Sequence, residues 1–215
     1  MKIKVANYIS QFLVDHGVTN AFSVVGGGAM HLNDAFGHQE GLHTTYNHHE
    51  QACAIAAEAY ARLENKIALV CVTSGPGGIN ALTGVCGGWL DSIPMFIVSG
   101  QVKYTTTSRY AKTLNPEINL RSLGDQEYDI VKSFEPMTKY AVMIKTLWIS
   151  AMLAKRLGTL QQQADRALFG LMFLLIFRVL LLKQMTLLKL TMHQRMTLFF
   201  RRTWLTARLS MFLMR

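Results

Sequence analysis

Segments with helical spacing of apolar residues alternate with short, nearly continuous apolar runs along the first two thirds of the chain. The helical segments are residues 5–16, 30–36, 49–63 and 77–89. The predicted strands are residues 21–25, 42–46, 67–72 and 94–99, and the runs 21–25, 67–72 and 94–99 are apolar enough to predict buried strands. Strands that are apolar throughout are typical of a parallel sheet buried on both faces. The alternation therefore predicts an α/β domain of three layers, a parallel sheet with helices on both faces.

The pattern changes after residue 100. Residues 103–125 are polar and irregular, which predicts a surface loop, and ordered apolar patterning returns over residues 127–143. Within the alternating region, the turn at Gly26, the acidic residue Glu50 and the turn at Gly75 each follow a predicted strand. Because ligands of such sheets bind beyond the carboxyl ends of the strands, we expect these three features to meet at one edge.

Composition divides the chain at residue 145. The net charge of +9 belongs to the tail alone, because residues 1–145 carry a net charge of −1 and residues 146–215 one of +10. All 4 prolines and 14 of the 16 glycines lie before residue 146, and the tail is rich in Leu and Met. We therefore predict an enzyme-like domain over 1–145 and a basic tail over 146–215. This distribution gives no support to a nucleic-acid partner.

The cysteines and the N-terminus indicate where the protein works. Cys53, Cys71 and Cys86 lie in apolar runs without CxxC spacing, which favours buried free thiols in a reducing compartment. The first residues run directly into an amphipathic segment and lack the apolar core of a signal peptide. We expect a cytoplasmic protein.

Two motifs carry the chemistry. Tyr46-Asn47-His48-His49-Glu50-Gln51-Ala52 leads into an Ala-rich helix, and Thr73-Ser74-Gly75-Pro76-Gly77-Gly78-Ile79-Asn80 opens the next helix one strand later. In this order the pair resembles the pyrimidine-binding domain of thiamine-diphosphate enzymes, in particular the acetolactate synthase group. The resemblance covers residues 1–145 and stops there.

The resemblance implies a catalytic role for Glu50. A glutamate at this position hydrogen-bonds N1′ of the aminopyrimidine and favours the imino tautomer, which removes the proton from C2 of the thiazolium ring. The cofactor then acts as an electron sink in the decarboxylation of a 2-keto acid. The competing interpretation is an acidic residue that only stabilises a helix N-terminus. The matched second motif favours the catalytic one.

The resemblance also implies a set of cofactor-binding residues at the edge of the sheet. Besides Glu50, these are Gly27, Gly28, Ala29, Thr73, Pro76, Gly77 and Asn80. The family usually has a proline where this chain has Gly26, and commonly has a phenylalanine where it has Asp125. Asp125 therefore bears on substrate choice. The neighbouring Gln126 is either a residue of the substrate channel or a surface glutamine.

No metal site is predicted within the chain. His48, His49 and Glu50 are adjacent in sequence, so on a helix their side chains point in different directions. The resemblance implies that Mg²⁺ and the diphosphate are held by a second domain with a Gly-Asp-Gly motif, which this sequence lacks. It also implies a homo-oligomer in which this half meets the diphosphate-binding domain of a second subunit. FAD is possible in the full-length parent.

Residues 146–215 allow three interpretations. The apolar run 167–177 ends at Arg178 and is shorter than the roughly 20 residues of a membrane-spanning helix. An amphipathic basic helix on a membrane surface is the second interpretation.

The third interpretation of residues 146–215 is translation in the wrong reading frame. Codons for residues 146–152 can encode Pro-Leu-Asp-Ile-Arg-Tyr when regrouped, and codons for 163–174 can encode Gly-Arg-Pro-Gly-Pro-Val-Trp-Leu-Asp-Val-Pro. Both strings resemble the family's continuation, in order, so we favour a frameshift and no evolved domain over 146–215.

The resulting prediction is the pyrimidine-binding half of a carboligase or decarboxylase of 2-keto acids. The acetolactate synthase-like parent would decarboxylate pyruvate and transfer the two-carbon unit to a second keto compound. We expect the truncated chain to be inactive by itself. Two alternatives remain open: a stand-alone subunit that pairs with a separate diphosphate-domain chain, and a membrane-associated binding protein that uses the basic tail.

Overall fold

The computed structural model describes residues 3–144, 173–177 and 181–182. The chain divides into two compact units, one of residues 4–180 and the other of residues 1–3 with 181–215. The short strands β1 (Ile3–Lys4) and β8 (Leu181–Leu182) form a two-stranded sheet. All remaining described elements belong to the unit of residues 4–180, which also contains the candidate site.

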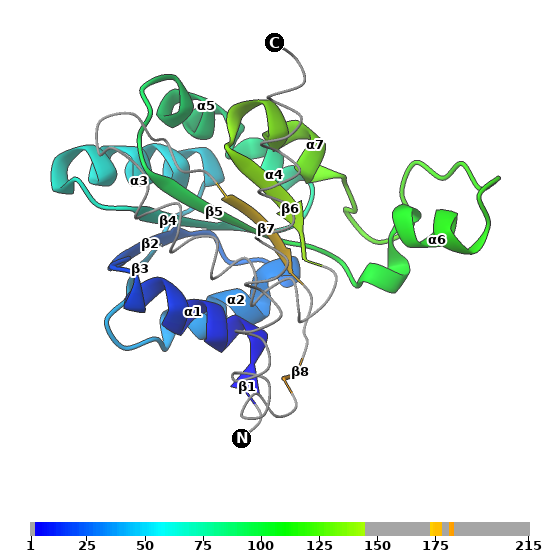
Figure 1. Ribbon diagram of the computed structural model, residues 1–215, viewed down its shortest axis with the longest axis horizontal. Coiled ribbons are helices and arrows are strands. Elements are labelled where there is room, and N and C mark those ends of the chain that lie inside the picture. The colour runs from blue at the N-terminus through cyan, green and yellow to red at the C-terminus, as the bar shows by residue number, and fades with distance from the viewer. Residues whose placement is uncertain (1–2, 145–172, 178–180, 183–215) are drawn as a thin grey trace, which may run out of the picture. The chain divides into compact units, whose positions relative to one another are not determined.

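This unit is built on a six-stranded sheet in the order β3-β2-β4-β5-β7-β6, with every neighbouring pair parallel. The strands are β2 (Asn20–Ser23), β3 (His43–Tyr46), β4 (Ala68–Val72), β5 (Met95–Gly100), β6 (Tyr140–Met143) and β7 (Phe173–Phe177). Figure 1 shows α1 (Val5–Asp15) and α2 (Met30–Gly37) on one face and α3 (Glu50–Glu64), α5 (Leu82–Leu90) and α7 (Ile130–Phe134) on the other. The predicted three-layer α/β fold is confirmed.

Two of the apolar runs, residues 67–72 and 94–99, form the buried centre of the sheet as β4 and β5. The run predicted over 21–25 is only partly buried, since β2 ends at Ser23 and Val25 is exposed, and the strand predicted over 42–46 is the partly exposed edge strand β3. Every residue of β4 and of β5 is buried, which explains why neither strand shows the alternation of a half-exposed strand. The core between this sheet and its helices includes Val70, Ile97, Ile130 and Phe134, all fully buried. Strands this deeply packed hold their carboxyl ends, and the loops that follow, in fixed positions.

Two predicted segments differ in detail. The helix expected over 77–89 is divided at Ala81 into α4 (Pro76–Asn80) and α5, consistent with the weak helix propensity of its glycines. The region 103–125 is not only a loop, because it contains the 3-10 turn η2 (Tyr104–Thr106) and α6 (Ser108–Leu114). The missed signal was Thr107, whose side-chain oxygen accepts a hydrogen bond from the Tyr110 N–H and caps α6.

No strand is predicted after residue 145, yet β7 lies in the sheet between β5 and β6. It comes from the end of the apolar run 167–177. A short apolar run of this kind is compatible with a buried strand, and periodicity alone does not identify it. Apart from β7 and β8, the residues of the tail lie outside the described part of the chain. Within the described part, no helix has the length and apolar character needed to cross a membrane.

Candidate active site

Three strands end at the same edge of the sheet, and each leads into one of the predicted motifs. β2 is followed by the glycine turn η1 (Gly27–Ala29), β3 by the helix α3 that begins at Glu50, and β4 by the turn that opens α4. The strands are parallel neighbours, so their carboxyl ends point the same way. The structure therefore gathers the three motifs as the sequence predicted.

Glu50 is the first residue of α3 and is half-buried. Its Oε2 accepts a hydrogen bond of 2.7 Å from Nδ2 of Asn80, at the end of α4. The same Nδ2 lies 3.3 Å from Nε2 of His49. Asn80 thus fixes one carboxylate oxygen, while the other points toward Gly77: a Cβ built on Gly77 would lie 3.2 Å from Oε1 of Glu50.

Thr73 connects this carboxylate with the glycine turn. Its Oγ1 accepts a hydrogen bond of 3.2 Å from the N–H of Gly28. Its Cγ2 would lie 2.6 Å from a Cβ on Gly77, and its Cβ would lie 2.6 Å from a Cβ on Gly26. The glycines at these positions allow the two turns to approach on either side of Thr73. A further close approach occurs at Gly100, where a Cβ would lie 2.2 Å from the carbonyl oxygen of Gly28.

The remaining predicted cofactor residues occupy three different environments. Ala29 is buried beneath the glycine turn, and Gly27 is exposed with nothing near its would-be Cβ. Pro76 is exposed at the start of α4, where its missing N–H costs no helical hydrogen bond. Of the predicted set, Glu50, Gly77 and Asn80 form one group, and Gly27, Gly28 and Thr73 line an adjoining cavity.

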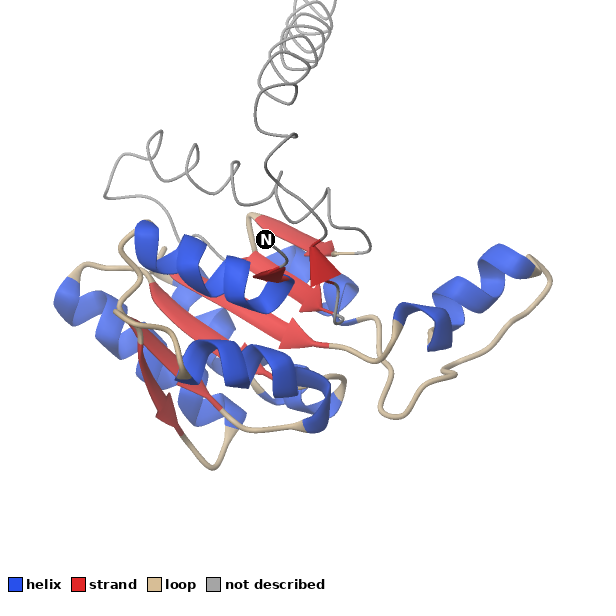
Figure 2. Ribbon diagram, turned by 90° about the horizontal axis from the view of Figure 1, so that it is seen from below, coloured by secondary structure: helices blue, strands red, loops and turns tan. Residues whose placement is uncertain are grey.

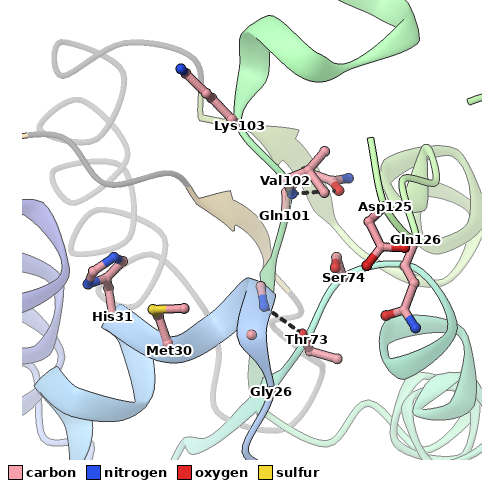
Figure 3. A pocket seen from close by; sticks show the side chains of 12 residues that line it. Gly26, Met30, His31, Thr73, Ser74, Gln101, Val102, Lys103, Asp125 and Gln126 are labelled. Carbon is pink, nitrogen blue, oxygen red and sulfur yellow. Dashed lines mark hydrogen bonds between the residues drawn. The ribbon is translucent and has the colours of Figure 1, made fainter. Parts of the chain in front are cut away.

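This cavity has a volume of about 560 Å³ and is open to one side. Figure 3 shows His31 and Met30 on one wall and Asp125 and Gln126 on the opposite wall. Gln126, the predicted channel residue, therefore does reach a cavity next to the glycine turn. The residues that line it are Gly26, Gly27, Gly28, Met30, His31, Thr73, Ser74, Gln101, Val102, Lys103, Asp125 and Gln126.

His31, Met30 and Lys103 line the cavity although the sequence analysis assigned them no role. His31 lies one residue into α2 directly after the glycine turn, and that proximity was the available signal. Gln101 directly follows β5 and is buried. Its Nε2 donates to the Tyr128 carbonyl at 2.9 Å, and its Oε1 accepts from the Val102 N–H at 2.9 Å, so its side chain braces the cavity wall.

Burial changes the pKa of two cysteine thiols, and hydrogen bonds change that of one glutamate. Burial raises the pKa of the Cys71 thiol to about 12, and burial also raises that of Cys53. Cys53 and Cys71 are buried and Cys86 is half-buried, and all three are free thiols.

Burial favours a higher pKa for Glu127, but hydrogen bonds from Ser108 and from the Leu123 and Gly124 amides outweigh the effect of burial, and the pKa of Glu127 is lowered. No group of three His, Cys, Asp or Glu residues suited to a metal ion occurs among residues 3–144, 173–177 and 181–182.

The fold and this edge define an α/β domain with a glutamate-led helix set between glycine turns. Residues 3–123 match the thiamine pyrophosphate enzyme family, in the part described as the N-terminal TPP binding domain. The match covers more than half of the chain, and the chain belongs to this family. The resemblance found in the sequence is thereby confirmed.

Several curated relatives carry the same segment. The acetolactate synthase large subunit of Haemophilus influenzae is 34% identical over 144 residues, which is 67% of this chain and 23% of the relative. The acetolactate synthase isozyme 3 large subunit of Escherichia coli is 32% identical over 140 residues, 65% of this chain and 22% of the relative. The chloroplastic acetolactate synthase of Arabidopsis thaliana is 34% identical over 127 residues, 58% of this chain and 19% of the relative. The chain thus spans less than a quarter of the length of these relatives.

Proposed function

We propose that this chain is the pyrimidine-binding half of a thiamine-diphosphate-dependent carboligase that acts on 2-keto acids. The parent enzyme decarboxylates pyruvate and transfers the two-carbon unit to a second keto compound. The support comes from the family to which the chain belongs and from its relatives, which are acetolactate synthase subunits. The single observation that carries the proposal is the placement of Glu50 at the edge where the three strand-end turns meet.

The residues at this edge suit an aminopyrimidine. The Asn80 amide holds one Glu50 oxygen, and the other faces Gly77, whose missing Cβ leaves room for the Glu50 carboxylate beside the Thr73 methyl group. The thiamine cofactor would supply the electron sink for decarboxylation. We propose that Glu50 accepts a hydrogen bond from the protonated ring nitrogen and holds that proton in place. Gly27, Gly28, Ala29, Thr73, Pro76, Gly77 and Asn80 would form the surrounding walls.

We propose that the cavity beside Thr73 is the substrate channel. Gln126 and Asp125 form one wall, and His31 the opposite one. Amide, carboxylate and imidazole groups suit a small polar keto compound better than a purely apolar acceptor. Asp125, where the family commonly has a phenylalanine, would then influence which acceptor is used.

The further parts of the enzyme are also proposals. Mg²⁺ and the diphosphate would be held by a diphosphate-binding domain of a second subunit, within a homo-oligomer in the cytoplasm. FAD is a possible further cofactor of the parent. We propose that catalysis needs the diphosphate-binding domain and that the segment 1–145 is inactive by itself.

We propose that the evolved sequence ends near residue 145 and that 146–215 is read out of frame. The family match ends at residue 123, and the alignments with the relatives cover 127–144 of the 215 residues. Resequencing the gene across the codons for Ile144 and Thr146 tests the proposal. A missing base that restores an Asp-Ile-Arg-Tyr frame would support it, whereas an unbroken reading frame confirmed from independent DNA would contradict it.

A chimeric enzyme tests the proposed function. Residues 3–144 replace the matching segment of the Escherichia coli isozyme 3 large subunit, and the native segment reinserted through the same junctions serves as the control. We expect the chimera to exchange the C2 proton of thiamine diphosphate and to form acetolactate from pyruvate. A folded chimera that binds the cofactor but exchanges C2–H no faster than free cofactor in buffer would contradict the proposal.

Two alternatives make different predictions. A stand-alone subunit would copurify with a separate chain that contains Gly-Asp-Gly. A membrane-associated binding protein would pellet with anionic vesicles, and cutting after Lys145 would abolish the binding, because the basic residues of the chain are concentrated beyond that point.

A further inference from the structure

An arm of the chain leaves the sheet after β5 and returns before α7. The arm is residues 103–124 and includes η2 and α6. Figures 1 and 2 show α6 projecting away from the sheet. The outgoing and returning segments of the arm meet at Ser108, where α6 begins, and at Leu123 and Gly124. We call this meeting point the base of the arm.

The Glu127 carboxylate joins the two sides of this base. Oε1 accepts hydrogen bonds from the N–H of Ser108 at 2.8 Å and from its hydroxyl at 2.7 Å. Oε2 accepts hydrogen bonds from the N–H of Leu123 at 2.6 Å and from that of Gly124 at 3.4 Å. Each oxygen therefore holds one side of the arm. Hydrogen bonds to a charged acceptor are stronger than those between neutral groups.

The residues directly before Glu127 form a wall of the cavity. Gln126 has a φ of +54°, in the left-handed region that non-glycine residues seldom adopt. Its carbonyl oxygen packs against the turn that opens α4, because a Cβ on Gly75 would lie 2.1 Å from it. The N–H of Glu127 donates to the Gly124 carbonyl at 3.1 Å and closes the turn around Asp125 and Gln126. Gln126, with its unusual backbone conformation, therefore lies between Gly75 and the residues that Glu127 contacts.

We propose that Glu127 is a positioning residue for the cavity: by binding both sides of the arm, its carboxylate holds Asp125 and Gln126 in the cavity wall against Gly75. The clasp, defined as Glu127 with Ser108, Leu123 and Gly124, links the arm to the predicted substrate channel. The hydrogen bonds of the clasp are independent of the proposed function, whereas a role of the clasp in shaping a substrate channel rests on that function. If Glu127 only joined the two sides of the arm, removing its carboxylate would leave Asp125 and Gln126 in their places in the cavity wall.

Backbone amide exchange and chemical shifts of the full chain, measured by NMR without any ligand, test the proposal. We expect Glu127→Ala to accelerate exchange of the Ser108, Leu123 and Gly124 amides by about tenfold or more. We also expect it to move the amide resonances of Gln126 and Gly75. Glu117→Ala is the matched control, since Glu117 is an exposed carboxylate on the same arm and its side chain makes no hydrogen bond or ion pair within residues 3–144.

The conservative variant Glu127→Gln adds a graded result. A glutamine keeps one acceptor oxygen and replaces the other by an NH₂ group, so it can satisfy only one side of the arm. We expect faster exchange on one side and an intermediate shift at Gln126. This variant also serves if Glu127→Ala does not fold.

Two results would overturn the proposal. One is amide exchange in the Glu127 variants within twofold of that in the Glu117 control. The other is an opened arm with unchanged Gln126 and Gly75 resonances, which would reduce Glu127 to a tie within the arm. Neither measurement involves the cofactor, so a failure of the proposed function in the chimera would remain a separate result.

Discussion

At the scale of single residues, the candidate site depends on positions where a methyl group does not fit. Gly77 is the clearest, because its missing Cβ leaves room for both Thr73 and Glu50. The sequence predicted the importance of this glycine from the motif alone. It did not predict that Thr73 would be the side chain against which the glycine turns pack, because that contact joins segments 45 residues apart.

We predict that Gly77→Ala destabilises the protein by about 1–3 kcal/mol, the usual cost of overpacking. The new methyl group would lie 2.6 Å from Cγ2 of Thr73, which cannot turn away without losing the hydrogen bond from Gly28. Urea unfolding measures the effect. Gly27→Ala is the control, since nothing lies within 4 Å of its Cβ position. Equal stability of the two variants would contradict the packing described here.

Glu127 makes stability depend on pH in a defined direction. Its pKa in the folded protein lies below the ordinary value of 4.5, since the hydrogen bonds from Ser108, Leu123 and Gly124 outweigh the effect of burial. Folding therefore favours the ionised carboxylate. The resulting stabilisation is complete above pH 4.5 and is lost as the pH falls through the lowered value.

We predict that the difference in unfolding free energy between wild type and Glu127→Gln shrinks when the pH is lowered from 7 to 3. Urea titrations at several pH values measure it. A difference that stays constant over this range, or grows toward low pH, would show that the carboxylate is not stabilised by its neighbours.

At the scale of elements, the short apolar runs identified β4 and β5 because these strands are buried on both faces. Boundaries were less predictable. The division of α4 from α5 falls in a segment of weak helix propensity, and α6 depends on a single capping hydroxyl. The glycines of that segment weaken a helix without marking the residue at which it breaks, and one threonine is a weak signal for α6.

The packing of α3 on α5 gives a matched pair of substitutions. A Cβ on Gly84 would lie 2.6 Å from Cβ of Ala54 and 2.8 Å from the backbone nitrogen of Ile55, which cannot move independently. A Cβ on Gly87 would meet only the carboxylate of Glu58 at 2.9 Å, at the end of a flexible side chain.

We predict that Gly84→Ala destabilises the protein by about 1–3 kcal/mol despite the better helix propensity of alanine. Gly87→Ala should cost less, because only the end of the Glu58 side chain has to shift, although its Oε1 accepts hydrogen bonds from Arg62. Thermal unfolding of both variants is the measurement. The packing account fails if Gly87→Ala is the more destabilised of the two.

At the scale of the whole molecule, the order of strands and motifs was predictable because parallel strands place successive loops at one edge. The position of β7 between β5 and β6 was not, because pairing between strands distant in sequence leaves no local pattern. The residues that line the cavity differ in the same way. Gln126 was found through a motif and His31 could have been found from its place next to the glycine turn, whereas Lys103 reaches the cavity only through the fold.

The central claim is that Glu50 acts on the pyrimidine of thiamine diphosphate, and C2–H exchange in the chimeric enzyme tests it most directly. Glu50→Gln is compared with Glu64→Gln, an exposed glutamate at the far end of the same helix. We predict that Glu50→Gln slows exchange by roughly 10²- to 10⁴-fold, the usual contribution of a positioned acid–base group, and that Glu64→Gln leaves exchange unchanged. Exchange in Glu50→Gln as fast as in Glu64→Gln, with cofactor still bound, would contradict the account.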